Sequence, residues 1–268
     1  MAITFRQLSD LSGRRALITG ATGALGRVMA HTLAEMGADL ILVDRPESDF
    51  SNLERELSES WGVCPRSIIC DLEIEEQRSK LIDQVNKDRV GLNILINNAA
   101  FVGTSGLSGW IDSFEHQSLV TWRRAFEVNL TAAFHLCQAF SPSLSANSNG
   151  NIINIASIYG EFGPDWSLYD GTPMGNPAAY GASKGGLIQL TRWLATTIGP
   201  KVRVNAISPG GVLRGQPELF VNRYIKRTPL ARMASEDDFR GAVAYLASDL
   251  SSYVTGQVLR VDGGWSIW

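Results

Sequence analysis

Residues 16–26, Ala-Leu-Ile-Thr-Gly-Ala-Thr-Gly-Ala-Leu-Gly, decide how the rest of the chain is interpreted. A short run of strand-forming residues ends at Thr19, and a loop with glycines at positions 20, 23 and 26 follows it. A helical pattern over residues 27–36 begins directly after the loop. Glycines at a strand-to-helix turn let the backbone approach a pyrophosphate, and the helix N-terminus presents N–H groups and a positive dipole end to the phosphates. The stretch therefore predicts a dinucleotide-binding turn.

A carboxylate at the end of the next apolar run supports this prediction. Asp44 follows residues 40–43 and comes 18 residues after Gly26. A carboxylate in this position accepts hydrogen bonds from the adenosine ribose hydroxyls and repels a 2′-phosphate. Asp44 therefore favours NAD as the cofactor. Arg45, directly after it, is a candidate partner for a 2′-phosphate and keeps NADP open as the less favoured alternative.

Short aliphatic runs alternate with amphipathic stretches along the chain. The runs that predict strands are residues 16–19, 40–43, 67–70, 92–96, 151–155, 203–206 and 258–261. The helical patterns are residues 27–36, 52–61, 75–87, 119–140, 179–197 and 236–248. Near-continuous apolar strands separated by helices indicate a parallel sheet covered on both faces. We therefore expect an α/β protein: a doubly wound Rossmann fold with a seven-stranded parallel sheet, in one domain over residues 1–268.

Composition narrows the class of function. The 268 residues are 44% hydrophobic and 19% charged, with a net charge of -3 and a pI near 5.7. This balance gives no basic footprint for nucleic acid, and no apolar run approaches the ~20 residues of a membrane helix. Three scattered cysteines and three dispersed histidines lack metal-ligand spacing. We expect no metal site, no nucleic-acid or membrane partner, and a cytoplasmic protein with reduced thiols.

The segment Tyr180-Gly-Ala-Ser-Lys184 carries a second chemical signal. Positions i and i+4 share one face of a helix, so the Lys184 ammonium can lie beside the Tyr180 phenol. A free tyrosine, with a pKa of about 10, is a poor base near neutrality. A fixed cation and the positive ring of an oxidised nicotinamide favour the phenolate. Because the same spacing also occurs on plain surface helices, its weight depends on the motifs around it.

Those motifs identify a family. Besides the glycine loop they are, in chain order, Asp71-Leu72, Asn97-Asn98-Ala99-Ala100, Asn129, Ser157, Tyr180–Lys184, Pro209-Gly210, Val254-Thr255-Gly256 and Asp262-Gly263-Gly264. Over nearly its whole length the chain resembles the single-domain branch of the short-chain dehydrogenase/reductase family. The resemblance implies an NAD(P)-dependent oxidoreductase that interconverts an alcohol and a carbonyl.

The resemblance also implies four catalytic residues. Tyr180 would be the general acid/base, and Ser157 would hydrogen-bond the same substrate oxygen. Lys184 would lower the pKa of Tyr180 and hold the nicotinamide ribose. Asn129 would position a water that links Lys184 to solvent.

For the cofactor, the resemblance implies contacts along the whole dinucleotide. Asp71 would meet the adenine, the Asn98-Ala99 backbone would run beside the adenosine ribose, and residues 209–212 would lie against the nicotinamide. The implied cofactor-binding residues are Gly20, Thr22, Gly23, Leu25, Gly26, Asp44, Arg45, Asp71, Leu72, Asn98, Ala99, Tyr180, Lys184, Pro209, Gly210 and Val212.

Two single-residue departures from the family pattern affect the cofactor side. Ala24 stands where single-domain members usually carry the middle glycine, and we expect Gly23 to do much of that glycine's work. Arg214 stands where many relatives carry a threonine that reaches the cofactor phosphates. Arg214 contacts a phosphate or a substrate anion, or it is an exposed arginine in a mobile loop.

The largest departure separates two of the implied catalytic residues. Ser157 and Tyr180 are 23 residues apart, farther than in most family members. The extra residues, 161–177, must emerge beside the active site because both of their ends are tethered there, and such loops often shape substrate pockets. An oligomer contact or a plain surface loop is the alternative. Tyr159 lacks a lysine four residues later, which argues against it as the catalytic tyrosine.

Residues 211–234 would form the substrate lid. This segment carries Arg214, Arg223, Lys226, Arg227 and Arg232, which suggests an anionic substrate, while a solvated basic helix face is the alternative.

The overall pattern, including the long Ser157–Tyr180 insertion and the segment Ser208-Pro-Gly-Gly-Val212, also resembles, more loosely, oxidoreductases of bacterial surface-sugar and flagellin-glycan pathways. It favours a sugar or nucleotide sugar as the small-molecule substrate, with a non-sugar alcohol or a 3-oxoacyl thioester as alternatives. The alternative from a different class of function is a redox sensor that binds the dinucleotide and catalyses no reaction. Family members of this size usually form tetramers, so we expect a homotetramer, with a dimer as the alternative. We expect Trp265 and Trp268 at the chain end to be covered at a subunit interface or near a neighbour's active site.

Overall fold

The computed structural model describes residues 3–88, 90–103, 107–147 and 149–268. Its centre is a seven-stranded parallel sheet in the order β3-β2-β1-β4-β5-β6-β7. All seven predicted strands are confirmed, with ends shifted by a few residues. They are β1 (Arg15–Thr19), β2 (Asp39–Asp44), β3 (Arg66–Ile69), β4 (Ile94–Asn97), β5 (Gly150–Ile155), β6 (Val202–Pro209) and β7 (Val258–Val261).

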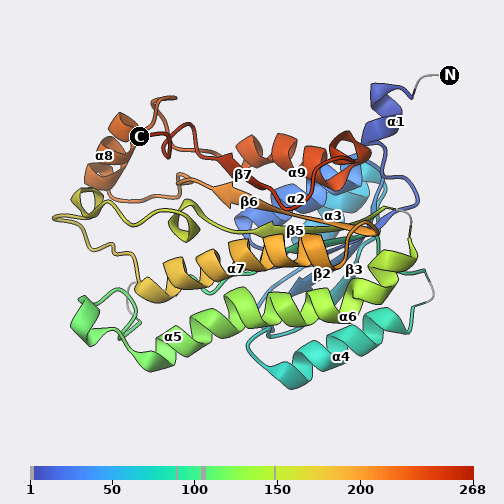
Figure 1. The fold of residues 1–268 in the computed structure, drawn as a ribbon, viewed down its shortest axis with the longest axis horizontal. Coiled ribbons are helices and arrows are strands. Elements are labelled where there is room, and N and C mark those ends of the chain that lie inside the picture. Colours follow the sequence, from blue (N-terminus) through green and yellow to red (C-terminus); the bar gives the residue numbers. More distant parts are fainter. Residues whose placement is uncertain (1–2, 89, 104–106, 148) are drawn as a thin grey trace.

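Helices cover both faces of this sheet (Figure 1). One face carries α2 (Ala24–Glu35), α3 (Ser51–Trp61) and α9 (Arg240–Ala247), and the other carries α4 (Glu75–Asn86), α5 (Leu119–Phe126), α6 (Ala132–Ala146) and α7 (Ala178–Thr197). The doubly wound Rossmann arrangement is therefore confirmed. Two helices were not predicted: α1 (Phe5–Ser9) near the N-terminus and α8 (Glu218–Arg227) at the opposite end of the molecule, beside the C-terminus.

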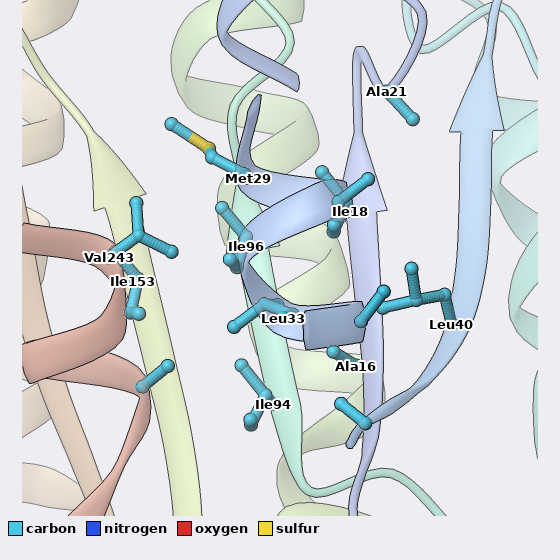
Figure 2. Packing of buried hydrophobic residues seen from close by; sticks show 14 of the residues in the cluster. Ala16, Ile18, Ala21, Met29, Leu33, Leu40, Ile94, Ile96, Ile153 and Val243 are labelled. Atoms are coloured by element: carbon cyan, nitrogen blue, oxygen red, sulfur yellow. The ribbon is translucent and has the colours of Figure 1, made fainter. Parts of the chain in front are cut away.

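The apolar runs form strands because they are buried from both sides. Figure 2 shows Met29 and Leu33 of α2 over Ile18 of β1 and Ile96 of β4. A second cluster fills the space beneath α4, α6 and α7. Burial of one such aliphatic side chain contributes about 1.5–3 kcal/mol to the free energy of folding. The two clusters therefore stabilise the sheet, whose strands position the loops at its edge.

The long helix predicted over residues 119–140 is interrupted. A π-helical turn, Glu127–Thr131, separates α5 from α6. Such single π turns inside helices are frequent at functional sites. Asn129 lies in this turn and is buried. The predicted helix over residues 236–248 likewise begins as a 3₁₀ turn, Glu236–Phe239, before α9.

A smaller apolar cluster lies apart from the two sheet clusters. It joins the segment after β5, the 161–177 segment, α8 and the C-terminal tail. We call it the cap cluster; its buried members are Ile158, Leu168, Tyr169, Phe220, Tyr224, Met233 and Trp265.

The two tryptophans of the tail behave differently. Trp265 is only 1% exposed and is covered by its own chain, whereas Trp268 is 72% exposed and donates from Nε1 to the Arg227 carbonyl, at 2.9 Å. Trp265 therefore needs no neighbouring subunit for cover. Among the helices of the described residues, none has the length and apolar character that crossing a bilayer requires.

Candidate active site

The sheet order places the glycine loop at a topological switch point. The chain winds outward from β1 through β2 to β3 and then returns to the other side of β1, where β4 lies. In such folds the crevice beyond the carboxyl ends of the strands at the reversal is where ligands bind. The loops after β1 and β4 both open there.

The glycine loop has no room for side chains at two positions. Gly20 has a φ of +64°, and a Cβ on it would lie 2.9 Å from the Ala99 Cα. A Cβ on Gly26 would lie 2.1 Å from the Gly20 carbonyl oxygen. Gly23 is the N-cap of α2 and offers no capping side chain, and Ala24 is the first helical residue. The loop is thus packed backbone against backbone, with the N-terminal amides of α2 left uncapped by a side chain at Gly23.

Thr19 and Asn98 lock the loop after β1 to the loop after β4. The Thr19 hydroxyl oxygen accepts from the backbone N–H groups of Asn98 and Ala99, at 3.0 and 3.1 Å. The Asn98 amide donates to the carbonyls of Thr19 and Gly20, at 2.9 and 3.0 Å. Because these bonds connect the two sides of the switch point, they fix the width of the crevice.

Asp44 lies at the end of β2, next to the glycine loop. Its Oδ2 accepts from the backbone N–H and the hydroxyl of Thr22, both at 2.8 Å, and its Oδ1 accepts from the Arg45 N–H at 2.9 Å. The Arg45 side chain instead lies 3.7 Å from Glu47, with both side chains 74% exposed. The carboxylate is therefore fixed at the loop, while the guanidinium is largely in solvent.

The loop that carries Asp71 and Leu72 is tied to the helix of Asn129. Arg78, 2% exposed, donates to the Leu72 carbonyl at 2.5 Å and pairs with Glu127 at 2.6 Å. Arg124 of α5 makes a second link to this loop, because it binds Glu73 through Nε at 2.7 Å and Nη2 at 3.0 Å. The sequence analysis missed both arginines, because an arginine on an amphipathic helix gives no signal of its distant partner.

Ser157, Tyr180 and Lys184 come together beyond the end of β5. Ser157 is the N-cap of the 3₁₀ turn Ile158–Gly160, and Tyr180 and Lys184 lie one turn apart at the start of α7. The Ser157 side chain hydrogen-bonds Tyr180. The Lys184 Nζ lies 6.0 Å from the centroid of the Tyr180 ring and donates to the Ile155 carbonyl at 2.6 Å.

The pKa values in this group follow from burial. Burial raises the pKa of Tyr180, while the hydrogen bond from Ser157 acts in the opposite direction. Burial also lowers the pKa of Lys184 to about 8. The lowering of the Tyr180 pKa that we expected from Lys184 is therefore not the dominant effect here, because burial of the phenol outweighs it.

Asn129 reaches this group through Ser183. Its Oδ1 accepts from the Phe101 N–H at 2.6 Å, and its Nδ2 donates to the Ser183 hydroxyl at 3.0 Å. Ser183 in turn donates to the Tyr180 carbonyl at 2.9 Å. Ser183, which the sequence analysis did not single out, therefore links the π turn to the backbone that carries Tyr180.

Residues 209–212, which we expected to face the nicotinamide, lie at and directly after the end of β6. The Gly210 N–H donates to the Val261 carbonyl at 2.9 Å, and the Gly211 N–H donates to the Tyr224 hydroxyl at 2.6 Å. Val212 pairs with Ala234 in an isolated parallel bridge. Pro209, the last residue of β6, and Gly210 thus lead from the sheet directly to the cap cluster.

A pocket of about 1000 Å³ opens beside the first turn of α7. Its described lining lies between residues 111 and 117 and between residues 159 and 181, so the 161–177 segment forms much of its wall. The charged side chains among these lining residues are Asp112 and Asp170.

The basic residues of the 211–234 segment are mostly engaged by the chain itself. Arg214 pairs with Glu236 at 2.9 Å, Arg227 with Asp165 at 2.5 Å and Arg232 with Asp238 at 2.6 Å. Arg223 donates to the Asp170 carbonyl. The sequence suggested an anion-binding lid, but each of these four guanidinium groups already has an internal partner, which weakens that hypothesis.

Comparison with known proteins agrees with the fold and the motif order. The family model described as enoyl-(acyl carrier protein) reductase matches residues 20–266. A tropinone reductase homolog of Arabidopsis thaliana is 32% identical, covering 96% of this chain and 94% of the relative. Galactitol 2-dehydrogenase (L-tagatose-forming) of Cereibacter sphaeroides is also 32% identical, covering 98% and 99%. The post-translational flagellin modification protein A of Campylobacter coli is 29% identical, covering 96% and 100%.

Solved structures give the same result. A putative NAD(P)-dependent gluconate 5-dehydrogenase of Beutenbergia cavernae, with bound NADP, superimposes with a TM-score of 0.85 at 32% identity, covering 97% of this chain and 100% of the other. NAD⁺-bound xylitol dehydrogenase superimposes with a TM-score of 0.83 at 31% identity, covering 95% and 99%.

A doubly wound Rossmann fold with these motifs at its switch point defines an oxidoreductase that acts on CH–OH groups. The chain belongs to the short-chain dehydrogenase/reductase family.

Proposed function

We propose that the protein is an NAD-dependent dehydrogenase/reductase in which Tyr180 exchanges a proton with the substrate oxygen. The observation that carries this proposal is the convergence of Ser157, Tyr180 and Lys184 beyond the carboxyl end of β5, at the same edge of the parallel sheet as the glycine loop. The bound nicotinamide supplies the hydride acceptor or donor. Tyr180 takes the hydroxyl proton as the alcohol is oxidised and returns it when the carbonyl is reduced, and Ser157 hydrogen-bonds the same oxygen.

Lys184 and Asn129 support this proton transfer in the proposal. A lysine with a pKa of about 8 is mostly protonated near neutrality, so its charge favours the Tyr180 phenolate once the ammonium turns from Ile155 toward the ring. Asn129 fixes the backbone of Tyr180 through Ser183. Its proposed role in ordering a water would add a path for the proton to solvent.

The residues of the crevice fit a dinucleotide. Gly20 and Gly26 leave no space for a Cβ, which brings the backbone close to a pyrophosphate at the N-terminus of α2. Thr22, Gly23 and Leu25 would complete this turn, and Asp71, Leu72, Asn98 and Ala99 would line the adenosine half. Pro209, Gly210 and Val212 would line the nicotinamide half.

Asp44 supports NAD over NADP. Its carboxylate is held at the loop by Thr22, where a 2′-phosphate would meet its charge, while the Arg45 guanidinium lies beside Glu47. Isothermal titration with NAD⁺ and NADP⁺ in parallel tests the assignment. Tighter NAD⁺ binding supports it, and tighter NADP⁺ binding means that Arg45 outweighs Asp44. If neither dinucleotide binds, the cofactor proposal is wrong, and Ala24 in place of the usual glycine becomes the first residue to test.

Tyr180→Phe tests the catalytic role. The variant keeps the ring and loses the proton-transferring hydroxyl, so turnover should fall by about 10²–10⁴-fold, while the protein should still bind the dinucleotide. A redox sensor would bind the dinucleotide equally well with either residue and show no turnover to lose. Unchanged turnover in Tyr180→Phe contradicts the proposal.

For the substrate we propose a sugar or polyol, with a nucleotide sugar included in that class. The relatives named for galactitol and for flagellin modification support this choice. A relative named 3-oxoacyl-[acyl-carrier-protein] reductase, of Aquifex aeolicus, is 29% identical and keeps the thioester alternative open. A screen of both classes with NAD⁺ and NADH separates them.

We further propose that residues 1–268 form one domain, with residues 161–177 as an insertion and residues 211–234 as a lid, and that the chain assembles as a homotetramer. Trp122, Phe134 and Trp193 support an interface on α5, α6 and α7, because they are 37%, 42% and 54% exposed. Light scattering that finds a monomer at micromolar concentration contradicts the assembly. A cytoplasmic location stays a prediction.

A further inference from the structure

Three polar side chains form a chain of hydrogen bonds in the wall of the pocket. The hydroxyls of Tyr159 and Tyr169 lie 2.7 Å apart, and the Asn176 Nδ2 donates to the Tyr169 hydroxyl at 3.3 Å. All three residues line the pocket beside α7. The 161–177 segment supplies two of them, and none belongs to a motif that identified the family.

These hydrogen-bonded side chains lie next to Ser157 and Tyr180. The Tyr159 N–H donates to the Ser157 hydroxyl oxygen at 3.2 Å. Ala178 and Gly181, which lie on either side of Tyr180 in α7, line the same pocket as Tyr159 and Tyr169. A substrate bound with its reacting oxygen at Ser157 and Tyr180 would therefore have its neighbouring carbons near Tyr159 and Tyr169.

The two hydroxyls retain hydrogen-bonding capacity. Each tyrosine has one donor hydrogen and two acceptor lone pairs. One of the two hydrogens lies in the bond between them, and the other is left for a further acceptor. Burial raises the pKa of both phenols, so both stay neutral at physiological pH. Neutral donor and acceptor groups suit a hydroxyl of the ligand and do not compensate a negative charge.

The charge of the pocket points the same way. Its charged lining residues within the described part of the chain, Asp112 and Asp170, are both acidic. The α8 arginines that contact the 161–177 segment, Arg223 and Arg227, are bound to the Asp170 carbonyl and to the Asp165 carboxylate. A phosphate in this pocket would meet no cationic side chain among the described lining residues.

We propose that Tyr159, Tyr169 and Asn176 recognise a second, uncharged hydroxyl group of the substrate, close to the reacting carbon. This proposal rests on the proposed function and narrows it to polyols and hydroxy ketones without phosphate. The 161–177 segment is thereby a specificity element, because it delivers Tyr169 and Asn176 to the wall beside Tyr180.

A matched pair of probes tests this recognition. Oxidation of 1,2-cyclohexanediol and of cyclohexanol by NAD⁺ is compared in the wild type, Tyr169→Phe and Asn176→Ala. The wild type should prefer the diol in kcat/KM. Tyr169→Phe should lower kcat/KM for the diol by about tenfold, the effect of one hydrogen bond, and leave cyclohexanol almost unchanged. Asn176→Ala should shift the ratio in the same direction.

Controls separate recognition from folding and from proton transfer. Tyr253→Phe, at a fully exposed tyrosine, should leave both probes unaffected, and melting temperatures should show that each variant is folded. Profiles over a range of pH identify any change in the ionisation of Tyr180, which would move both probes together.

Each outcome has a distinct meaning. Equal losses for both probes, or no change in their ratio, overturn the recognition proposal and leave the proposed function standing. Turnover of both probes that survives Tyr180→Phe overturns the proposed function instead. Failure of the wild type to bind or oxidise either probe contradicts the recognition of simple polyols.

Discussion

The glycine loop and the cap cluster lie at the same edge of the sheet but are built in different ways. In the loop, backbone meets backbone: Gly26 lies against the Gly20 carbonyl, and Gly20 lies against Ala99. In the cap cluster, side chains from distant segments meet: Trp265 stacks on Tyr224 with ring centroids 5.9 Å apart, and the Arg227 guanidinium lies 4.5 Å from the Trp265 ring.

This difference explains what each region tolerates. A Cβ added at Gly20 or Gly26 would meet backbone atoms of neighbouring residues, so the loop cannot accept a side chain at either position without moving. A cluster of aromatic side chains can be repacked while keeping its volume. The cap region can therefore accept substitutions that the backbone contacts of the glycine loop exclude.

Gly26→Ala should have the largest effect. The added Cβ would lie 2.1 Å from the Gly20 carbonyl oxygen and 2.8 Å from the Ala21 Cα. Because both neighbours are backbone atoms, the loop must move, and we expect a loss of about 4 kcal/mol in the free energy of unfolding together with loss of dinucleotide binding. Denaturant unfolding and titration calorimetry measure the two effects.

Gly241→Ala is the matched control for that change. It lies in α9 with open space around its Cβ position, so the free energy of unfolding should rise by about 0.5–1 kcal/mol. Equal effects at the two glycines would show that the loop is not constrained by backbone contact.

Trp265→Ala should affect the cap region and spare the loop. Removing a fully buried tryptophan costs about 3 kcal/mol or more, here in a cluster separate from the two sheet clusters. Hydrogen exchange should accelerate in α8 and in the 161–177 segment, while dinucleotide affinity changes far less than in Gly26→Ala.

Trp268→Ala offers a control three residues away. Its side chain is 72% exposed and makes one bond, to the Arg227 carbonyl, so exchange in the cap region should change little. If Trp265→Ala unfolds the sheet and the cap together, the two regions form one cooperative unit and the contrast between them disappears.

Asp165→Asn should have the smallest effect, and that effect should depend on pH. Hydrogen bonds from Ser167, and then the Arg227 ion pair, lower the pKa of Asp165 below its ordinary value of 3.8. The carboxylate therefore stabilises the fold fully above that value, and its contribution is lost as the pH falls through the lower, folded-state pKa. The wild type should exceed the variant by about 1 kcal/mol near neutrality, and the gap should close in acid.

Asp237→Asn removes a more exposed carboxylate, 4.0 Å from Arg240 and itself 78% exposed. Its effect should be close to zero across the same pH range. A gap for Asp165→Asn that persists unchanged in strong acid would contradict the role of the ion pair in anchoring the 161–177 segment to α8.

The strands and most helices were predictable because their signals are local. Apolar runs such as residues 40–43 are buried on both sides, and the helical patterns carry a repeat that needs no knowledge of distant partners. The π turn at Glu127–Thr131 was not predictable, because its residues are compatible with a regular helix. Helix α8 was missed because its pattern covers only ten residues, Glu218–Arg227, inside a segment interpreted as a lid.

The sequence by itself determined which chemical motifs the chain carries and where they lie along it. These are the glycine turn, Asp44 after the next strand, and Tyr180 four residues before Lys184. Each motif could be recognised because it lies within one or two secondary-structure elements. Only the tertiary structure decided which residues surround that chemistry. It paired Arg227 with Asp165, buried Trp265 within its own chain, joined Arg78 to Glu127, and brought Tyr169 beside Tyr159. These contacts join residues far apart in the sequence or within an irregular loop, where no backbone periodicity records which side chains meet.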